Sequence, residues 1–229
     1  EVYEVGRVDS ATRTADQTEI AFFWADGPGT ATPPGHWLEI ARDLAAEHQL
    51  TLGESSRLIA LLGVAVADAA IIGWDAKYFF DYWRPVTGIR SASGDGNPHT
   101  RRDLEWTPLI PTPPFPGYVS GHSTFSGAAS RILALFFGHD TLAFSTTSDD
   151  LPGVVRSFPS LSAAAEEAGQ SRIYGGIHWQ FDNVEGLRAG RLAADEIFAL
   201  HFRPAAPATE CVSTASEICA LGRFLIRAD

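Results

Sequence analysis

The first segment that could do chemistry reads KYFFDYWRP and runs from Lys77 to Pro85. Lys77 and Arg84 are seven residues apart, which is two helical turns, so both cations can lie on one face of a helix. The neighbouring residues are strongly aromatic, and a buried cation in such surroundings needs an anionic partner. That partner is either a bound anion or a neighbouring carboxylate, Asp75 or Asp81. Two basic residues at this spacing are otherwise typical of a solvated helix face.

The second segment reads FPGYVSGHS and leads from a loop into a predicted helix that begins near Gly121. The first N–H groups of a helix have no intrahelical partner, and the helix dipole favours negative charge there. Ser120 adds a hydroxyl donor, Gly121 lets an anion approach the backbone, and His122 can donate or accept a proton beside it. The structural alternative is a serine that caps the helix, followed by a core histidine.

The third segment reads SRIYGGIHWQFD and ends at Asp182. Arg172 offers a planar and permanently charged guanidinium, which suits an oxyanion. His178 can act as a nucleophile or as a metal ligand through a neutral ring nitrogen. If the backbone is helical there, the Asp182 carboxylate can hold the other ring nitrogen. The alternative is an arginine–aspartate ion pair beside a buried histidine.

Together the three segments supply three cations, one helix N-terminus, one serine hydroxyl and two histidines. This set predicts a site for a tetrahedral oxyanion, with one histidine on its axis and a second histidine nearby.

Composition excludes several classes of protein. The chain has 229 residues, of which 45% are hydrophobic, and a formal net charge of −11. This acidity argues against a nucleic-acid-binding protein, which needs a basic face. The absence of methionine indicates a processed chain, an excised fragment or an incomplete record. Cys211 and Cys219 can form one local disulfide in an exported protein, and we favour an exported location over a cytoplasmic one.

The elements that must position these residues are predicted to be helices. Apolar periodicity, capping patterns and prolines place them at 36–49, 54–83, 121–137, 160–174 and 182–202, with loops at 91–117 and 141–158 and an irregular segment at 1–35. Signals for strands are nearly absent. We therefore predict an all-α helical bundle that forms a single catalytic domain over 1–229.

One stretch is apolar enough to raise the question of a membrane helix. It runs from Leu58 to Trp74 and contains Asp68, whose charge is expensive in lipid. We interpret it as a buried core helix, and we do not expect an integral membrane protein.

The three segments resemble the superfamily that joins vanadium-dependent haloperoxidases, type-2 phosphatidic-acid phosphatases and bacterial acid phosphatases, over residues 74–182. The chain departs from this pattern at Val119, where the family commonly has proline. The resemblance implies a helical bundle and a vanadate cofactor, whose place phosphate or sulfate can also take. It implies no haem.

The resemblance also implies a role for each residue. Lys77, Arg84 and Arg172 would neutralise the equatorial oxygens of vanadate or phosphate, and Ser120 and the Gly121 N–H would donate hydrogen bonds to it. His178 would be the axial vanadium ligand, or the nucleophile that becomes phosphohistidine in a phosphatase. Asp182 would orient His178, and His122 would be the acid–base residue.

Two aromatic residues favour a haloperoxidase over a phosphatase. Trp74 and Phe115 stand at positions that resemble the halide-pocket aromatics of chloroperoxidases, although core packing is the alternative for both. The expected partners are then hydrogen peroxide, a halide and a small organic acceptor. The remaining alternatives are a soluble acid phosphatase and an oxyanion-binding protein that is not an enzyme.

Members of this family are usually longer than this chain. The chain is therefore expected to be the C-terminal part of a longer protein, or to cover its exposed apolar faces by forming a homo-oligomer.

Overall fold

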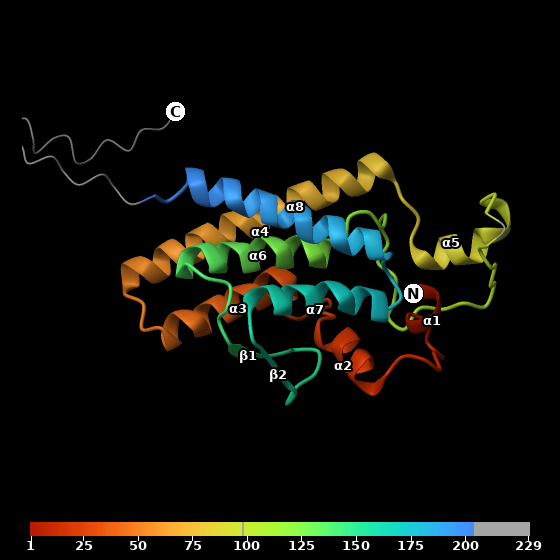
Figure 1. Ribbon diagram of the computed structural model, residues 1–229, viewed down its shortest axis with the longest axis horizontal. Helices are drawn as coiled ribbons and strands as arrows, with labels where there is room; N and C mark the ends of the chain where they lie inside the picture. Colours follow the sequence, from red (N-terminus) through yellow and green to blue (C-terminus); the bar gives the residue numbers. More distant parts are fainter. Residues whose placement is uncertain (98, 204–229) are drawn as a thin grey trace, which may run out of the picture.

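The computed structural model describes residues 1–97 and 99–203, and most of the regular structure in these residues is helical (Figure 1). The elements are α1 (Val2–Val5), α2 (Ala15–Phe23), α3 (Thr32–Glu47), α4 (Leu52–Phe80), α5 (Pro85–Ser91), a short 3-10 helix (Ala92–Gly94), α6 (Gly121–Phe137), β1 (Phe144–Thr147), β2 (Val155–Phe158), α7 (Leu161–Tyr174) and α8 (Gln180–Leu200). The predicted all-α class is confirmed. Cys211 and Cys219, which can form a local disulfide in an exported protein, lie outside the described residues.

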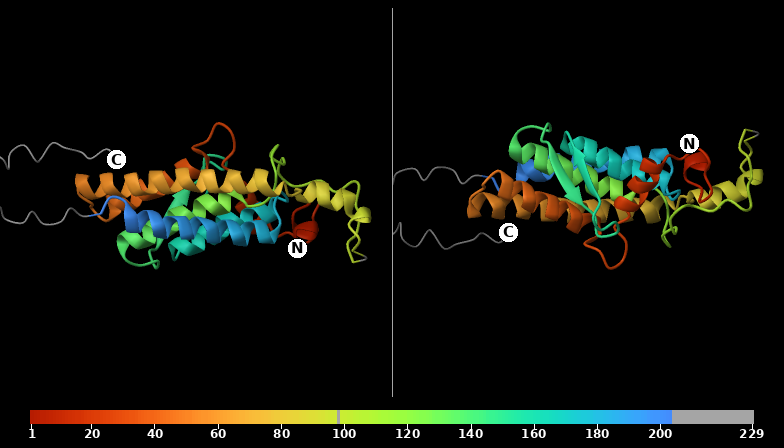
Figure 2. Two further views of the ribbon diagram at one scale, coloured as in Figure 1. Left: turned by 90° about the horizontal axis from the view of Figure 1, so that it is seen from above. Right: turned by 90° about the horizontal axis from the view of Figure 1, so that it is seen from below.

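Helix α6 forms the centre of the bundle and packs against α4, α7 and α8. Figure 2 shows α4 running along the molecule beside α8. Two glycines allow α6 and α8 to approach each other. A Cβ atom at Gly127 would overlap the backbone of Leu187, and one at Gly190 would overlap the carbonyl of Thr124. Because backbone cannot give way as a flexible side chain can, this close contact requires glycine at both positions.

The predicted starts of α6 and α7 are confirmed by their caps. Ser120 accepts a hydrogen bond from the Ser123 N–H, and Ser160 accepts one from the Ala163 N–H. These caps satisfy backbone donors that the helix itself leaves free. Helix α6 ends at Gly138, which has a φ of 84°.

The prediction of one helix over 54–83 is wrong at its C-terminal end. Helix α4 ends at Phe80, and Asp81 adopts a left-handed conformation with a φ of 46°. Aspartate tolerates this conformation better than most residues. Lys77 and Arg84 therefore do not share a helix face, because Arg84 lies beyond the turn as the N-cap of α5.

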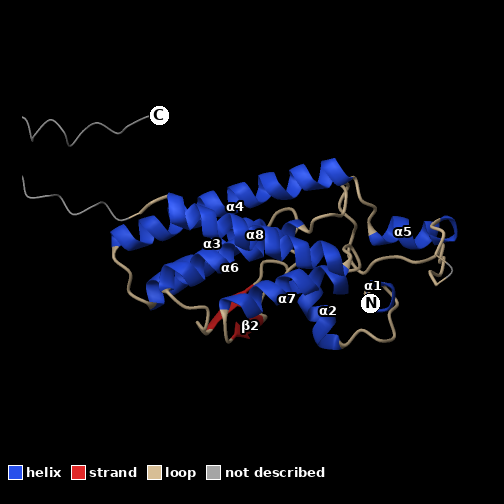
Figure 3. Ribbon diagram, turned by 45° about the horizontal axis from the view of Figure 1, so that its top comes forward, coloured by secondary structure: helices blue, strands red, loops and turns tan. Residues whose placement is uncertain are grey.

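Two segments that we predicted to be irregular or looped contain regular structure. Within 1–35, α2 begins with a capping box in which the side chains of Thr14 and Gln17 each bond the other's backbone. Within 141–158, β1 and β2 form an antiparallel hairpin that places Phe144 opposite Phe158 (Figure 3). Each strand has four residues, which is too short for alternation to be recognised in the sequence.

Helix α4 is partly exposed. By length and composition it could cross a membrane, and only 39% of its most apolar stretch is buried within the protein. Leu58, Leu61 and Leu62 point into the core, whereas Ile71 is 67% exposed. The interpretation of α4 as a core helix therefore holds for its buried face but not for its exposed face. The expectation that the protein is not an integral membrane protein stays a prediction.

Candidate active site

The residues singled out in the sequence lie at one end of the bundle, on the right in Figure 1. The C-terminal ends of α4 and α7 meet the N-terminal ends of α6 and α8 there. These ends carry Lys77 on α4, Arg84 before α5, Ser120, Gly121 and His122 at the start of α6, Arg172 on α7, and His178 and Asp182 at the start of α8. The tertiary structure thus brings together residues from all three segments.

His178 and Asp182 form a buried pair. The Nδ1 atom of His178 lies 2.8 Å from Oδ2 of Asp182, and the side chains are 4% and 0% exposed. The pair does not arise from continuous helix, because His178 precedes α8 and Asp182 lies in its first turn. The same carboxylate oxygen accepts the Trp179 N–H at 3.1 Å. Asp182 therefore caps the helix and orients the imidazole at the same time.

The other ring nitrogen of His178 faces Arg84. Nη1 of Arg84 lies 2.8 Å from Nε2 of His178. A guanidinium can only donate, so this contact and the Asp182 contact assign the proton to Nδ1 and the lone pair to Nε2. Burial and the nearby guanidinium of Arg84 lower the pKa of His178 well below its usual value, which keeps the ring neutral. In this structure the Nε2 lone pair accepts the hydrogen bond from Arg84. If Arg84 gives up that bond, a neutral imidazole can ligate a metal centre or act as a nucleophile.

Arg84 is held in place by the protein backbone. Its Nε donates to the Phe115 carbonyl at 3.0 Å, and its Nη1 donates to the Ile177 carbonyl at 2.8 Å. Its Nη2 is buried without a hydrogen-bond partner among the described residues. Burial lowers the pKa of Arg84 to about 10, so the side chain stays charged at neutral pH.

Arg172 and His122 both bind the segment that follows α2. Nη1 of Arg172 donates to the Trp24 carbonyl at 2.6 Å, and Nε2 of His122 lies 3.2 Å from the Ala25 carbonyl. The Nε atom of Arg172 is buried and unpartnered within the described part of the chain. Burial and the charge of Arg172 lower the pKa of His122 well below its usual value. His122 is thus a neutral, half-buried ring beside a cation.

Lys77, which is predicted to neutralise an oxygen of the anion, bonds the protein backbone in this structure. Its ammonium donates to the carbonyls of Pro116 at 3.1 Å, of Gly117 at 3.0 Å and of Val119 at 2.5 Å. An ammonium has three donors, so all of them serve the loop that leads into α6. Burial and the charge of Arg84 lower the pKa of Lys77 to about 7.

Ser120 belongs to a small buried network. Its Oγ accepts the Ser123 N–H at 3.3 Å and lies 2.8 Å from the Ser123 hydroxyl. That hydroxyl also lies 2.8 Å from Oδ1 of Asn183, an acceptor that takes the Ser123 proton. Ser120 then donates its own proton to the Ser123 oxygen, because the 2.8 Å contact between the two hydroxyls needs a donor. Binding of an anion by the Ser120 hydroxyl would require this proton to turn away from Ser123, whereas the cap of α6 uses only the Ser120 oxygen and would remain.

The two aromatics predicted to form a halide pocket flank this site. The ring centroids of Trp74 and Phe115 are 5.3 Å apart. Nζ of Lys77 lies 5.8 Å from the Trp74 ring and 5.3 Å from the Phe115 ring, and the Arg84 guanidinium lies 5.1 Å from the latter. Both rings therefore contact the cations of the site.

The donor set fits a tetrahedral anion such as vanadate or phosphate. Lys77, Arg84 and Arg172 are 0%, 5% and 3% exposed, and a buried excess of positive charge needs an anion. The buried guanidinium nitrogens without partners are donors of the kind that such an anion accepts. Among the described residues no group of three or more His, Cys, Asp or Glu could hold a metal cation.

Sequence reasoning missed the segment from Trp24 to Asp26. Its first two carbonyls hold Arg172 and His122, and Oδ1 of Asp26 lies 3.1 Å from Nδ1 of buried His36. The imidazole of His36 stacks on the Trp24 ring with centroids 4.7 Å apart. No local sequence pattern predicts the contacts with Arg172 and His122, because these partners lie far away in the chain.

Comparison with known proteins places this chain in a family. The family model of the VCPO second helical-bundle domain matches residues 57–219. The vanadium chloroperoxidase of Curvularia inaequalis is 30% identical over 232 residues, which cover 76% of this chain and 37% of that protein.

Solved structures give the same result. The crystal structure of a bacterial vanadium-dependent iodoperoxidase is 36% identical, with a TM-score of 0.72, and the match covers 81% of this chain and 44% of that chain. A holo-type bacterial vanadium-dependent chloroperoxidase is 21% identical with a TM-score of 0.66, which shows a shared fold. The chain spans less than half the length of these relatives. By the family match and the identity to the Curvularia protein, the chain belongs to the vanadium haloperoxidase family, through its second helical-bundle domain.

Proposed function

We propose that the protein is a vanadate-dependent haloperoxidase that oxidises a halide with hydrogen peroxide to hypohalous acid. The observation that supports this most is the Nε2 lone pair of His178, buried beside Arg84 and surrounded by cations. When bound, vanadate would supply Lewis-acid activation of hydrogen peroxide toward attack by the halide.

Each residue of the chain has a task in this proposal. Nε2 of His178 would bind vanadium, and Asp182 would keep the proton on Nδ1. The free guanidinium nitrogens of Arg84 and Arg172 would bind vanadate oxygens. Anion binding would release one Lys77 donor from the loop carbonyls.

His122 would act as the base for the incoming peroxide. Its Nε2 donates to the Ala25 carbonyl, so Nδ1 is the nitrogen that can accept a proton. Its lowered pKa keeps that nitrogen unprotonated near neutral pH. Trp74 and Phe115 would form the halide pocket, where the positive edges of the rings and the adjacent cations favour an anion.

A phosphomonoesterase is the second candidate, because donors of this kind select a tetrahedral anion without selecting its central atom. His178 would attack phosphorus and form phosphohistidine, and His122 would protonate the leaving alkoxide. The contact of Trp74 and Phe115 with the cations favours the haloperoxidase.

Paired assays on one preparation test the proposal. The protein is incubated with orthovanadate, hydrogen peroxide and bromide, and bromination of a cyclic diketone is followed. In parallel, hydrolysis of an aryl phosphate is measured without vanadate. We expect vanadate-dependent bromination that His178→Ala abolishes and that His139→Ala, at an exposed histidine, leaves unchanged. Phosphate release that vanadate inhibits, without bromination, would establish the phosphatase instead. Anion binding without either reaction would indicate a binding protein.

A further inference from the structure

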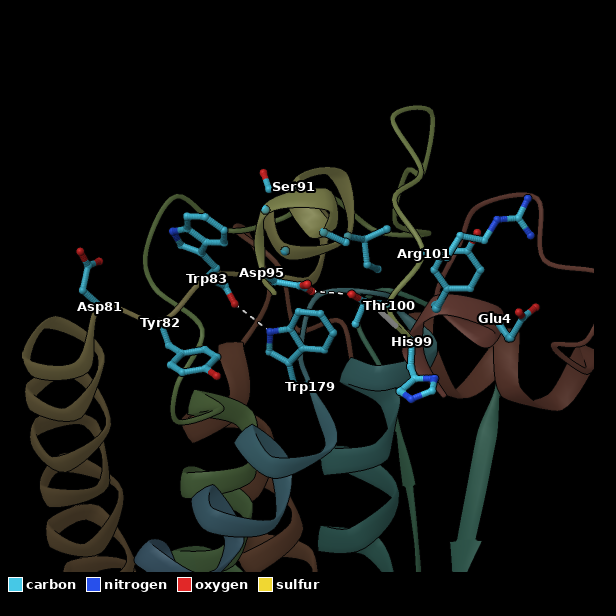
Figure 4. Close-up of a pocket in the computed structure, with 15 residues that line it drawn as sticks. Glu4, Asp81, Tyr82, Trp83, Ser91, Asp95, His99, Thr100, Arg101 and Trp179 are labelled. Carbon is cyan, nitrogen blue, oxygen red and sulfur yellow. Dashed lines mark hydrogen bonds between the residues drawn. The ribbon is translucent and has the colours of Figure 1, made fainter. Parts of the chain in front are cut away.

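A pocket of about 890 Å³ lies at the same end of the bundle, between α1, α5 and the turn before α8 (Figure 4). Its aromatic lining consists of Tyr3, Tyr82, Trp83 and Trp179. None of the residues that bind the oxyanion in the proposed function lines it. It is therefore a separate cavity whose use the proposed function does not explain.

The aromatic wall of this pocket is held by specific contacts. Nε1 of Trp179 donates to the Trp83 carbonyl at 2.7 Å, as the dashed line in Figure 4 shows. The adjoining Cζ2 edge of the Trp179 ring lies against Gly88, where an added Cβ would stand 2.8 Å from Cζ2. The indole is thus fixed along this edge by a hydrogen bond and by contact with the backbone of α5. Trp83, by contrast, is 58% exposed and available for a ligand.

The charge of the lining is also asymmetric. Glu4, Asp81 and Asp95 contribute three carboxylates, and Arg101 contributes one cation. The Asp95 carboxylate accepts a hydrogen bond from the Thr100 hydroxyl at 2.6 Å, which joins two of the lining residues (Figure 4). Aromatic walls with excess negative charge favour neutral or cationic aromatic molecules, and they disfavour anionic ones.

The pocket shares a wall with the oxyanion site. Trp83 immediately precedes Arg84, and Trp179 immediately follows His178. Arg84 and His178 are in contact at 2.8 Å, so their chain neighbours Trp83 and Trp179 lie next to the oxyanion site. A molecule in the pocket would lie next to the place where hypohalous acid is made.

We propose that this pocket binds the organic acceptor of the reaction, and that the acceptor is a neutral or cationic electron-rich aromatic molecule, such as a phenol or an indole. The inference rests on the proposed haloperoxidase function. In the step it implies, a ring carbon attacks the halogen of hypohalous acid, so that the carbon–halogen bond forms as the oxygen–halogen bond breaks. The ring carbon then loses its proton, and that proton and the departing hydroxide form water. Hydrogen peroxide supplies the oxidation, and no further oxidant is needed.

The first experiment measures binding without vanadate or peroxide, so it does not depend on the proposed activity. Fluorine NMR follows titrations of 5-fluoroindole, 5-fluorotryptamine and 5-fluoroindole-2-carboxylate. We expect saturable binding of the first two, and binding of the carboxylate that is at least about tenfold weaker. Trp83→Ala should weaken 5-fluoroindole binding by about 3- to 10-fold, the range expected for one stacked aromatic pair.

Two further variants sharpen this test. Phe79→Ala removes an aromatic that is 79% exposed and does not line the pocket, so binding should not change. Asp81→Asn removes one carboxylate from the lining, so it should weaken binding of the cationic 5-fluorotryptamine more than binding of the neutral 5-fluoroindole. Asparagine also tolerates the left-handed backbone at this position. Equal losses in Trp83→Ala and Phe79→Ala, a preference for the carboxylate, or the absence of saturation would overturn the inference.

A kinetic measurement then connects the pocket to the reaction. Trp83→Ala should raise the KM for an indole acceptor and leave the KM for bromide unchanged. Bromide oxidation without indole binding would refute the pocket inference alone. Indole binding without any halide oxidation would refute the proposed function, and with it the role of the pocket as an acceptor site.

Discussion

Nη1 of Arg84 lies 2.8 Å from Nε2 of His178, although 94 residues separate them in the chain. The contact occupies the lone pair that would bind vanadium, so anion binding at Nε2 would require Arg84 Nη1 to exchange this partner for an oxygen of the anion. Two backbone carbonyls, of Phe115 and Ile177, fix the guanidinium in this position. The cation is thus oriented before any anion binds, which is the arrangement expected of a preorganised site.

Arg84→Lys is expected to weaken sulfate binding by about 10- to 100-fold. Lysine keeps the charge, but it cannot bond both carbonyls and the imidazole in the planar geometry of a guanidinium, and charge-assisted bonds contribute about 1.5–3 kcal/mol each. Isothermal titration calorimetry with sulfate measures the loss. Arg191→Lys is the matched control, because the Arg191 side chain is 39% exposed on α8 and, within the described part of the chain, its ion pair is a 3.4 Å contact with Glu166. Equal affinities for all three proteins would contradict the role of Arg84.

Asp182→Asn is expected to lower vanadate affinity by about 10- to 100-fold, the usual effect of removing the partner of a metal-binding histidine. The amide can no longer hold the Nδ1 proton with a charged acceptor, so the Nε2 lone pair is less basic and less well oriented. Vanadate binding is measured by recovery of bromination activity against vanadate concentration. Asp195→Asn is the control, because Asp195 lies on α8 like Asp182 but forms a partly exposed ion pair with Arg131 of α6. This variant should not change the vanadate affinity. A normal curve for Asp182→Asn would show that the pair serves the helix cap alone.

The affinity for sulfate should depend on pH through Lys77. Burial and the charge of Arg84 lower the pKa of this side chain to about 7. The site therefore carries one positive charge more below that pH than above it, and anion affinity must fall as the pH rises. Sulfate remains a dianion throughout, so any change comes from the protein. A bound anion favours the protonated amine, which moves the midpoint of the curve above the value in the free protein.

Calorimetry should show that the sulfate affinity falls by about 3- to 10-fold between about pH 6 and pH 9. This loss is smaller than the maximum of about tenfold per pH unit that the linkage of one proton allows. In Lys77→Met the affinity should be low and independent of pH, provided that circular dichroism shows the variant to be folded. A pH dependence that survives in Lys77→Met would assign the effect to another group.

The close approach of α6 and α8 predicts a stability difference between two glycine variants. Gly190→Ala places a methyl group against the Thr124 carbonyl and should cost about 1–3 kcal/mol or more, because backbone must move to make room. For a chain of this size, that corresponds to a Tm lower by roughly 2–4 °C per kcal/mol. Gly63→Ala lies within α4 with no atom within 4 Å of the added methyl group, and it should stabilise the helix by about 0.5–1 kcal/mol. Thermal unfolding followed by circular dichroism compares the two, and equal shifts would refute the packing argument.

The sequence alone determined the local features of the site. The Ser120 cap, the start of α6 and the pairing of His178 with Asp182 depend on residues within four positions of one another. Such contacts are encoded by side-chain type and spacing, so they can be recognised without a structure. Apolar periodicity and capping patterns sufficed to predict the fold class, and the three motifs sufficed to predict the family.

Only the tertiary structure decided how the charged groups are oriented. The helix that was expected to align Lys77 with Arg84 ends at Phe80, and the Lys77 donors turn to a loop about 40 residues away. The segment from Trp24 to Asp26 reaches Arg172 and His122 across 148 and 97 residues. Hydrogen bonds over such separations leave no periodic trace in the sequence, because their partners are chosen by the packing of helices and not by local propensity. The sequence therefore determined which groups could bind an oxyanion, and the packing decided which of their donors remain free to do so.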